Sequence, residues 1–139
     1  MYIKERFDIS LQLESKVNDV CSSANIRESD LVERASQVAY AIMMQTKAGR
    51  HFLADDMRID LPKAQEVVFP EMAPLQVHIY ANAAEALRSV SQRCGISKQA
   101  VLSWGMECIE ILELALSWGP LFTDGPQGRE PFSPVLIKN

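Results

Sequence analysis

One hydrophobic pattern occurs twice in this chain, and the repeat limits the folds that the chain can adopt. Residues 6–42 and 76–112 align without a gap at a spacing of 70 residues (76 − 6 = 70). Each stretch opens with a short alternating run, continues with a helical pattern, breaks at Asn25 or Gly95, and ends in a second helical pattern. A strand followed by two helices cannot bury its apolar face alone, whereas two copies can pair their strands and interlock their helices.

The first copy predicts three elements, a strand over residues 4–11, a helix over 13–24 and a longer helix over 28–47. Alternation along the strand assigns one face to Phe7, Ile9 and Leu11 and the other face to Arg6, Asp8 and Ser10. Asn25 tolerates the left-handed backbone conformation and marks the end of the first helix.

The second copy predicts the same elements in the same order, over residues 75–80, 83–93 and 98–117. Asn82 and Glu85 have the spacing of a capping box at the start of the first of these helices. Gly95 is typical of a helix end, and Ser97 is typical of the start of the next helix.

The segments outside the copies are less regular. A connector rich in proline and acidic residues predicts a short helix near 51–57 and an extended piece near 65–69, and the Gly/Pro-rich tail indicates an irregular arm with apolar ends that dock. The expected organisation is a first copy at 1–47, the connector at 48–74, a second copy at 75–118 and a C-terminal arm at 119–139. The expected fold is α+β, mostly α, with both copies sharing one core around a two-stranded antiparallel ribbon.

Composition is that of a globular domain. Of 139 residues, 47% are hydrophobic and 23% are charged. The absence of a long apolar run and of a signal-peptide layout predicts a cytoplasmic protein without membrane contact, and three cysteines without close spacing argue against a disulfide framework. The net charge of −4 counts against non-specific nucleic-acid binding but leaves specific DNA binding open.

The second copy resembles the ribbon-helix-helix family, the group of the methionine and Arc repressors. The residues that carry the resemblance are the alternating run Leu75–Tyr80, the turn Gly95–Ile96–Ser97 and the long apolar helix after it. The first copy departs from the pattern, with Asn25 and Arg27 at the positions of Gly95 and Ser97. The resemblance implies a tandem, single-chain pseudodimer that is monomeric or pairs on DNA. It further implies a transcriptional regulator or an accessory protein in plasmid conjugation or T-DNA transfer.

The resemblance also implies a set of DNA contacts, because in this family the paired strands enter the major groove of duplex DNA. Base contacts are implied for the polar strand faces, Arg6, Asp8 and Ser10 with Gln76, His78 and Tyr80. Phosphate contacts are implied for Lys4 and for the starts of the two long helices, Arg27, Ser29, Ser97 and Lys98. Because the two strands differ, the target should not be a perfect palindrome.

Two other interpretations remain open. The polar strand faces are also what the solvated side of a small sheet would carry. The acidic balance and Asp8 motivate a second hypothesis, a protein-interaction module on the same scaffold that contacts its partner through the connector or the C-terminal arm. Salt dependence separates the two functions, since phosphate contacts weaken with added salt and apolar contacts do not.

Nothing in the sequence favours an enzyme, a cofactor or a metal site. The chain has no glycine-rich phosphate loop, no paired-cysteine motif and no nucleophile elbow. The spacing of His51 with Asp55 and Asp56 suits helical metal ligands but is common by chance. Trp104 and Trp118 are expected to be packing residues.

Overall fold

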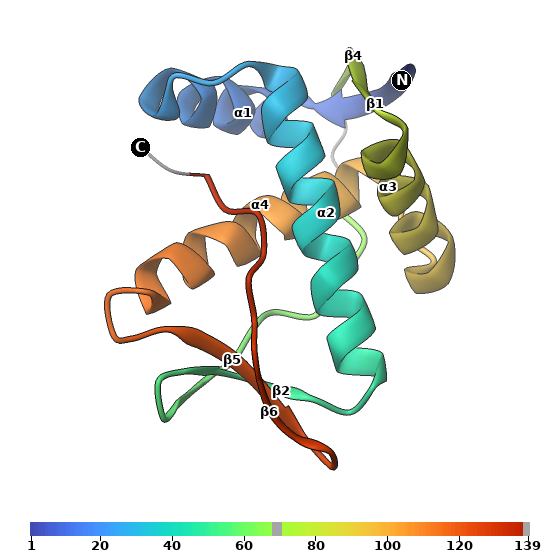
Figure 1. Ribbon diagram of the computed structural model, residues 1–139. Coiled ribbons are helices and arrows are strands. Elements are labelled where there is room, and N and C mark those ends of the chain that lie inside the picture. The colour runs from blue at the N-terminus through green and yellow to red at the C-terminus, as the bar shows by residue number, and fades with distance from the viewer. Residues whose placement is uncertain (68–70, 138–139) are drawn as a thin grey trace.

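The computed structural model describes residues 1–67 and 71–137 and shows an α+β protein that is about half helical. Within these residues the chain forms four helices and two small antiparallel sheets. The two sheets lie at opposite ends of the molecule, with the long helices between them (Figure 1). None of the described helices combines the length and the apolar character that a membrane crossing requires.

The order of strand, helix and helix is present twice. The first unit consists of β1 (Tyr2–Ser10), α1 (Leu11–Ala24) and α2 (Glu28–Lys47). The second unit consists of β4 (Met72–Tyr80), α3 (Ala81–Cys94) and α4 (Lys98–Ala115). β4 and α3 begin and end 70 residues after β1 and α1 (72 − 2 = 70; 94 − 24 = 70).

Helix ends follow the local signals at three of four predicted positions. Asn25 (φ 54°) and Gly95 (φ 66°) adopt the left-handed conformation after α1 and α3. Ser97 caps α4, because its side-chain oxygen accepts a hydrogen bond from the backbone N–H of Ala100 at 3.2 Å. The sequence therefore predicts these boundaries from residues that satisfy backbone groups locally.

The predicted capping box at Asn82 and Glu85 is wrong. β4 runs directly into α3, which begins at Ala81, so Asn82 is already inside the helix. Its side-chain oxygen accepts from the N–H of the next residue, Ala83, at 2.9 Å. The first strand was likewise expected to reach Leu11, which instead begins α1 and is exposed.

β1 and β4 form a two-stranded antiparallel ribbon with Arg6 opposite Gln76. These two positions are also aligned in the repeat (6 + 70 = 76). One face of the ribbon is buried against the helices and includes Ile9, Leu75, Val77 and Ile79. The other face is turned outward, as the period of two along a strand requires.

The two long helices form the centre of the core. α2 packs against α4, and the backbones approach closely where Gly105 meets Ala35. A Cβ at position 105 would overlap the carbonyl oxygen of Ala35, so this crossing requires glycine. Ala35 and Gly105 are again aligned positions (35 + 70 = 105).

The second sheet corrects two predictions. Its strand order is β3 (Met57–Ile59), β2 (His51–Ala54), β5 (Leu121–Gly125) and β6 (Gly128–Pro131). The connector therefore forms a hairpin where a short helix was expected, and the C-terminal arm forms strands where irregular chain was expected. The physical reason is that β2 and β5 pair with each other across a long stretch of sequence, and local patterns do not report such pairing.

Side chains join the connector to the rest of the fold. Trp104 is buried, and its indole N–H donates to the carbonyl of Pro62 at 2.8 Å, so its predicted packing role is confirmed. Phe132 and Ile137 are buried, as expected for an arm that docks.

Trp118 is 52% exposed, and its predicted packing role is wrong. Of the extended piece expected at 65–69, residues 65–67 have no regular structure and the remainder lies outside the described residues.

Candidate nucleic-acid interface

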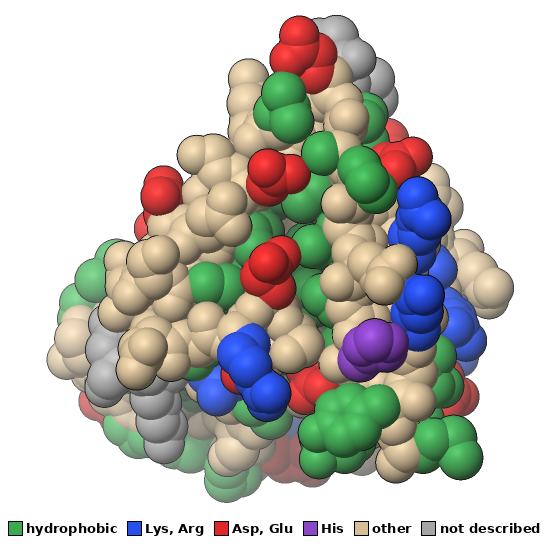
Figure 2. Space-filling model, turned by 90° about the horizontal axis from the view of Figure 1, so that it is seen from above, with side chains coloured by type: hydrophobic (Ala, Val, Ile, Leu, Met, Phe, Trp, Pro, Cys, Tyr) green, Lys and Arg blue, Asp and Glu red, His purple; other side chains and the backbone are tan. Residues whose placement is uncertain are grey.

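The outward face of the β1–β4 ribbon carries a row of polar and aromatic side chains. Its members are Tyr2, Lys4, Arg6 and Asp8 from β1, and Pro74, Gln76, His78 and Tyr80 from β4. The register sets Lys4 opposite His78 and Arg6 opposite Gln76. Figure 2 looks onto this end of the molecule and shows a histidine bordered by Lys or Arg side chains and by hydrophobic ones. Five of the six predicted base-contact residues therefore share one surface with Lys4.

The charge on this face is uneven. All of its formally charged groups come from β1, which contributes Lys4, Arg6 and Asp8. The β4 side contributes an amide, an imidazole and a phenol from Gln76, His78 and Tyr80, together with Pro74. A ligand on this face would meet different chemistry at its two edges.

An aromatic pair closes one end of the ribbon. The rings of Tyr2 and Tyr80 stack with their centroids 4.3 Å apart. A side-chain hydrogen bond with Tyr80 is the main cause that raises the pKa of Tyr2 above its ordinary value. Both rings remain about half exposed, which leaves them available for a flat or apolar contact.

Ser10 does not belong to the exposed face, and its prediction as a base contact is wrong. The residue is 0% exposed at the point where β1 turns into α1. Its side-chain oxygen caps α1 by accepting from the N–H of Leu13 at 3.0 Å. Its own N–H donates to the side-chain oxygen of Gln99 at 3.0 Å. The cap requirement of the helix explains this position better than strand alternation does.

A hollow of about 760 Å³ separates β4 from the start of α2. It brings the predicted phosphate contacts Arg27 and Ser29 onto one concave surface with Gln76, His78 and Tyr80. Three carboxylates also line it, those of Glu28, Asp30 and Glu33. Asp30 accepts from the N–H of Arg27 at 3.2 Å, so a carboxylate from the helix itself satisfies this helix start.

The start of α4 is occupied by Glu66 from the connector. One oxygen of this carboxylate accepts from the backbone N–H of Ser97 at 3.0 Å, and the other accepts from the Ser97 hydroxyl at 2.7 Å. The Ser97 hydroxyl, with smaller help from backbone N–H groups, lowers the pKa of Glu66. Gln99 donates to the carbonyl of the next connector residue, Val67, at 3.1 Å. The N–H that was expected to meet a phosphate therefore already meets an anion.

Lys98 forms an ion pair with a carboxylate on the helix-facing side of the ribbon. Its ammonium group lies 2.9 Å from Glu5, and Arg88 pairs with the other oxygen of the same carboxylate. Glu5 is only 3% exposed and lies on the helix-facing side of β1. Lys98 thus neutralises a buried charge in this arrangement, as a buried carboxylate requires.

Two carboxylates that shape the interface were missed from the sequence. Glu5 had a usable signal, since it follows the same alternation as Phe7 and Ile9 and so stands on the apolar side of the strand. Glu66 had none, because it lies in a segment without regular structure and reaches Ser97 across 31 residues. Tyr2 was missed because the strand was expected to begin later.

Comparison of the chain with protein-family models, with curated proteins and with solved structures finds no match in any of the three. Among the described residues, no cluster of His, Cys, Asp and Glu side chains is arranged to hold a metal ion. The ribbon and its two flanks are therefore the features of the molecule that bear on its function.

Proposed function

We propose that this chain binds duplex DNA sequence-specifically by inserting the exposed face of the β1–β4 ribbon into the major groove. It would act as a transcriptional regulator or as an accessory protein in plasmid conjugation or T-DNA transfer. The observation that carries the proposal is the row of exposed hydrogen-bonding side chains on a two-stranded ribbon, Lys4, Arg6, Gln76 and His78. The major groove admits a two-stranded ribbon of this kind.

We further propose that the two units form a single-chain pseudodimer with approximate two-fold symmetry. In a two-fold arrangement, the residue on the axis faces its own counterpart. Arg6 faces Gln76 across the ribbon, and Ala35 meets Gly105 at the helix crossing. Each of these pairs joins positions that are 70 residues apart (76 − 6 = 70; 105 − 35 = 70).

The pseudodimer predicts a monomer in solution, because one chain supplies both halves of the core. Sedimentation of the full chain over a range of dilutions measures this directly. A single species of about one chain mass at all concentrations is expected from the 15.6 kDa protein. A dimer that persists at the lowest concentration would contradict the proposal.

Base recognition is assigned to the centre of the ribbon. Arg6 can donate two hydrogen bonds to guanine, and Gln76 can pair in two places with adenine. Each such pair is worth roughly 1–3 kcal/mol of discrimination against the wrong base. Since Arg6 and Gln76 are opposed and different, the expected target has unlike half-sites.

Phosphate contacts are fewer than the sequence alone implied. Lys4 lies on the exposed face of the ribbon and Arg27 lines the hollow beside α2, whereas Lys98 is paired with Glu5 and the start of α4 holds Glu66. With Lys4 and Arg27 as the two cationic phosphate contacts, the logarithm of the DNA affinity should fall with the logarithm of salt with a slope of about −2. This slope is shallow for a DNA-binding protein and agrees with the acidic balance of the chain.

The test is selection of bound duplexes from a random DNA pool. Wild type should enrich one motif, and the triple variant Arg6→Ala, Gln76→Ala, His78→Ala should enrich none. Arg58→Ala is the matched control, because it removes an exposed cation from β3 at the opposite end of the molecule. Enrichment of the same motif by the triple variant would sink the assignment of the ribbon as the reading surface.

A protein-interaction module is the second candidate, and the acidic flanks favour it. Glu28, Asp30 and Glu33 line one side of the ribbon, and Glu66 occupies the other flank at α4. No enrichment by wild type or by any variant would support this candidate. The partner would dock through apolar parts of the connector or the C-terminal arm, so its binding should change little between low and high salt.

A further inference from the structure

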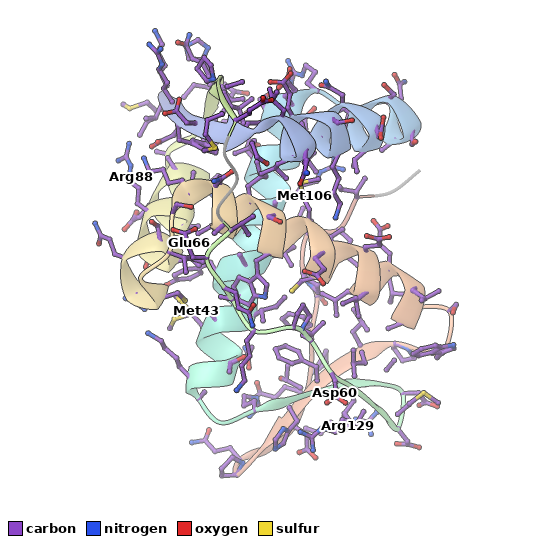
Figure 3. The ribbon with its side chains drawn as sticks, turned by 180° about the vertical axis from the view of Figure 1, so that it is seen from behind. Met43, Asp60, Glu66, Arg88, Met106 and Arg129 are labelled. Atoms are coloured by element: carbon purple, nitrogen blue, oxygen red, sulfur yellow. The ribbon has the colours of Figure 1, made fainter. Side chains whose placement is uncertain are left out.

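A second concave site lies away from the ribbon, beside the second sheet. It is a pocket of about 410 Å³ between the C-terminal end of α2, the β2–β3 hairpin and the segment 60–64 that follows. In Figure 3, Met43 is labelled on α2 and Asp60 on the chain beyond β3, and both residues line the pocket. Its volume falls in the range of about 300–1,000 Å³ that is usual for small-molecule sites.

The floor of this pocket is apolar and well ordered by packing. Its buried lining residues are Ile42, Met43, Phe52, Ile59 and Trp104. The hydrogen bond from Trp104 to the carbonyl of Pro62 ties one wall to the floor. A wall held in this way favours a preformed pocket over one that must assemble around its ligand.

The rim of the pocket is cationic. It carries Lys47, Arg50, Arg58 and Lys63 with a single acidic residue, Asp60, although the chain as a whole has a net charge of −4. Arg58 pairs with Asp60, and Arg50 is held by Thr123 and by the carbonyl of Gly128. Within the described residues, Lys47 and Lys63 have no ion pair, so two ammonium groups are free to meet an anion.

The C-terminal end of α2 repels an anion less than a helix end with free carbonyl groups would. Its last carbonyls are already used, because Met44 accepts from Ala48, Thr46 accepts from Gly49 and Gln45 accepts from Arg50. Satisfied carbonyls contribute less negative potential at the terminus than free ones do. The net field at the rim is therefore set by the lysine and arginine side chains.

A second apolar pocket offers an internal comparison. It has about 310 Å³ between α1 and α4, and its rim has one cation, Lys16, against the carboxylates of Asp19, Glu110 and Glu113. Burial raises the pKa of Glu113, which is the most enclosed of these three acids. The two pockets are similar in size and opposite in rim charge, so an anionic ligand should choose the cationic one.

We propose that the pocket lined by Lys47, Lys63, Phe52 and Trp104 binds a small organic anion with an apolar body, such as an aromatic or medium-chain carboxylate. The apolar body would lie on Phe52 and Trp104, and the carboxylate would meet Lys47 and Lys63. This site is separate from the ribbon and does not depend on the DNA proposal.

The probe for the test is anilinonaphthalene sulfonate, a fluorescent apolar anion, titrated into the folded full-length chain. A Trp118→Phe background leaves Trp104 as the remaining tryptophan of two, and the exposure of Trp118 makes this change mild. We expect saturable binding with loss of Trp104 emission, because a probe in this pocket lies well within energy-transfer range of the indole, and the lysine variants then locate the bound probe.

The double variant Lys47→Gln, Lys63→Gln should weaken probe binding about tenfold, since each lost charge-assisted contact removes part of the anion recognition. Lys16→Gln is the matched control at the acidic pocket and should leave affinity unchanged. Urea unfolding of each variant confirms that the fold is retained. Equal affinity of the double variant and wild type, or unchanged Trp104 emission at saturating probe, would overturn the proposal.

Discussion

The two strand–helix–helix units share the lengths and boundaries of their strands and first helices but differ in what holds them in place. At the position where the second unit has buried Leu75, the first unit has buried Glu5. Where the second unit crosses its partner helix with Gly105, the first has Ala35. The comparison shows that one backbone pattern can be stabilised by apolar packing on one side and by a paired charge on the other.

The starts of α2 and α4 also differ in the residue that stabilises them. Both are satisfied by a carboxylate, but α2 uses Asp30 from its own first turn and α4 uses Glu66 from the connector. The carboxylate at α2 always lies close to the start of the helix, because Asp30 belongs to the first turn of the helix itself. The anion at α4 comes from a segment without regular structure, 31 residues before Ser97 in the chain.

The largest expected effect is at the helix crossing. Gly105→Ala should lower the free energy of unfolding by about 3 kcal/mol, because the added Cβ overlaps the backbone of Ala35. The reverse change at the aligned position, Ala35→Gly, should cost only about 1 kcal/mol through helix propensity. Urea unfolding of both variants measures the difference, and equal losses would show that the crossing is not tight at Gly105.

The next effect is at the buried carboxylate. Glu5→Ala should lower the free energy of unfolding by about 2 kcal/mol, which is less than the usual cost of breaking a buried pair because Arg88 and Lys98 are partly exposed. Glu5→Leu copies Leu75 of the other unit and should restore most of this loss. A Leu variant as unstable as the Ala variant would mean that the charge itself holds β1 on the helices.

Removal of Glu66 tests whether the connector competes with DNA. Glu66→Ala should raise DNA affinity about tenfold, because the start of α4 then becomes free for a phosphate. Glu71→Ala is the control, since it removes an exposed acid of the same connector whose side chain makes no hydrogen bond or ion pair among residues 1–67 and 71–137. An equal gain in DNA affinity from both variants would show that the gain comes from the change in net charge and not from the vacated start of α4.

The same contact predicts a pH dependence. The pKa of Glu66 is lowered in the folded chain, so the contact stabilises the fold at pH values above the ordinary glutamate pKa and is lost as the pH falls through the lowered value. The free energy of unfolding should therefore fall less as the pH is lowered in Glu66→Ala than in Glu71→Ala, which keeps the contact. An equal fall in the two variants would contradict a folded-state contact between Glu66 and Ser97.

The smallest expected effect separates the two helix caps. Ser97→Ala should cost about 1 kcal/mol, because its side-chain oxygen accepts from the N–H of Ala100. Arg27→Ala at the aligned position should be nearly neutral, since an arginine side chain has no acceptor and Asp30 does the capping there. Thermal unfolding of the two variants at equal concentration measures this contrast.

Local patterns predicted much of the candidate site and little of its surroundings. Alternation was sufficient to place Arg6, Asp8, Gln76 and His78 on one face, because a strand has a period of two wherever it occurs. It failed at Ser10, where the strand ends and the helix takes the hydroxyl as its cap. Predictions of this kind hold inside an element and weaken at its boundary.

The sequence by itself determined the order of strand, helix and helix within the two repeated units and the caps at Asn25, Gly95 and Ser97, because these depend on contacts within a few residues. Only the tertiary structure decided that the connector and the tail pair as one sheet and that Glu66 lies on Ser97. Such contacts join residues far apart in the chain, and each depends on the whole fold bringing the partners together. The open ribbon face follows from the sequence, and the filled start of α4 follows from the fold.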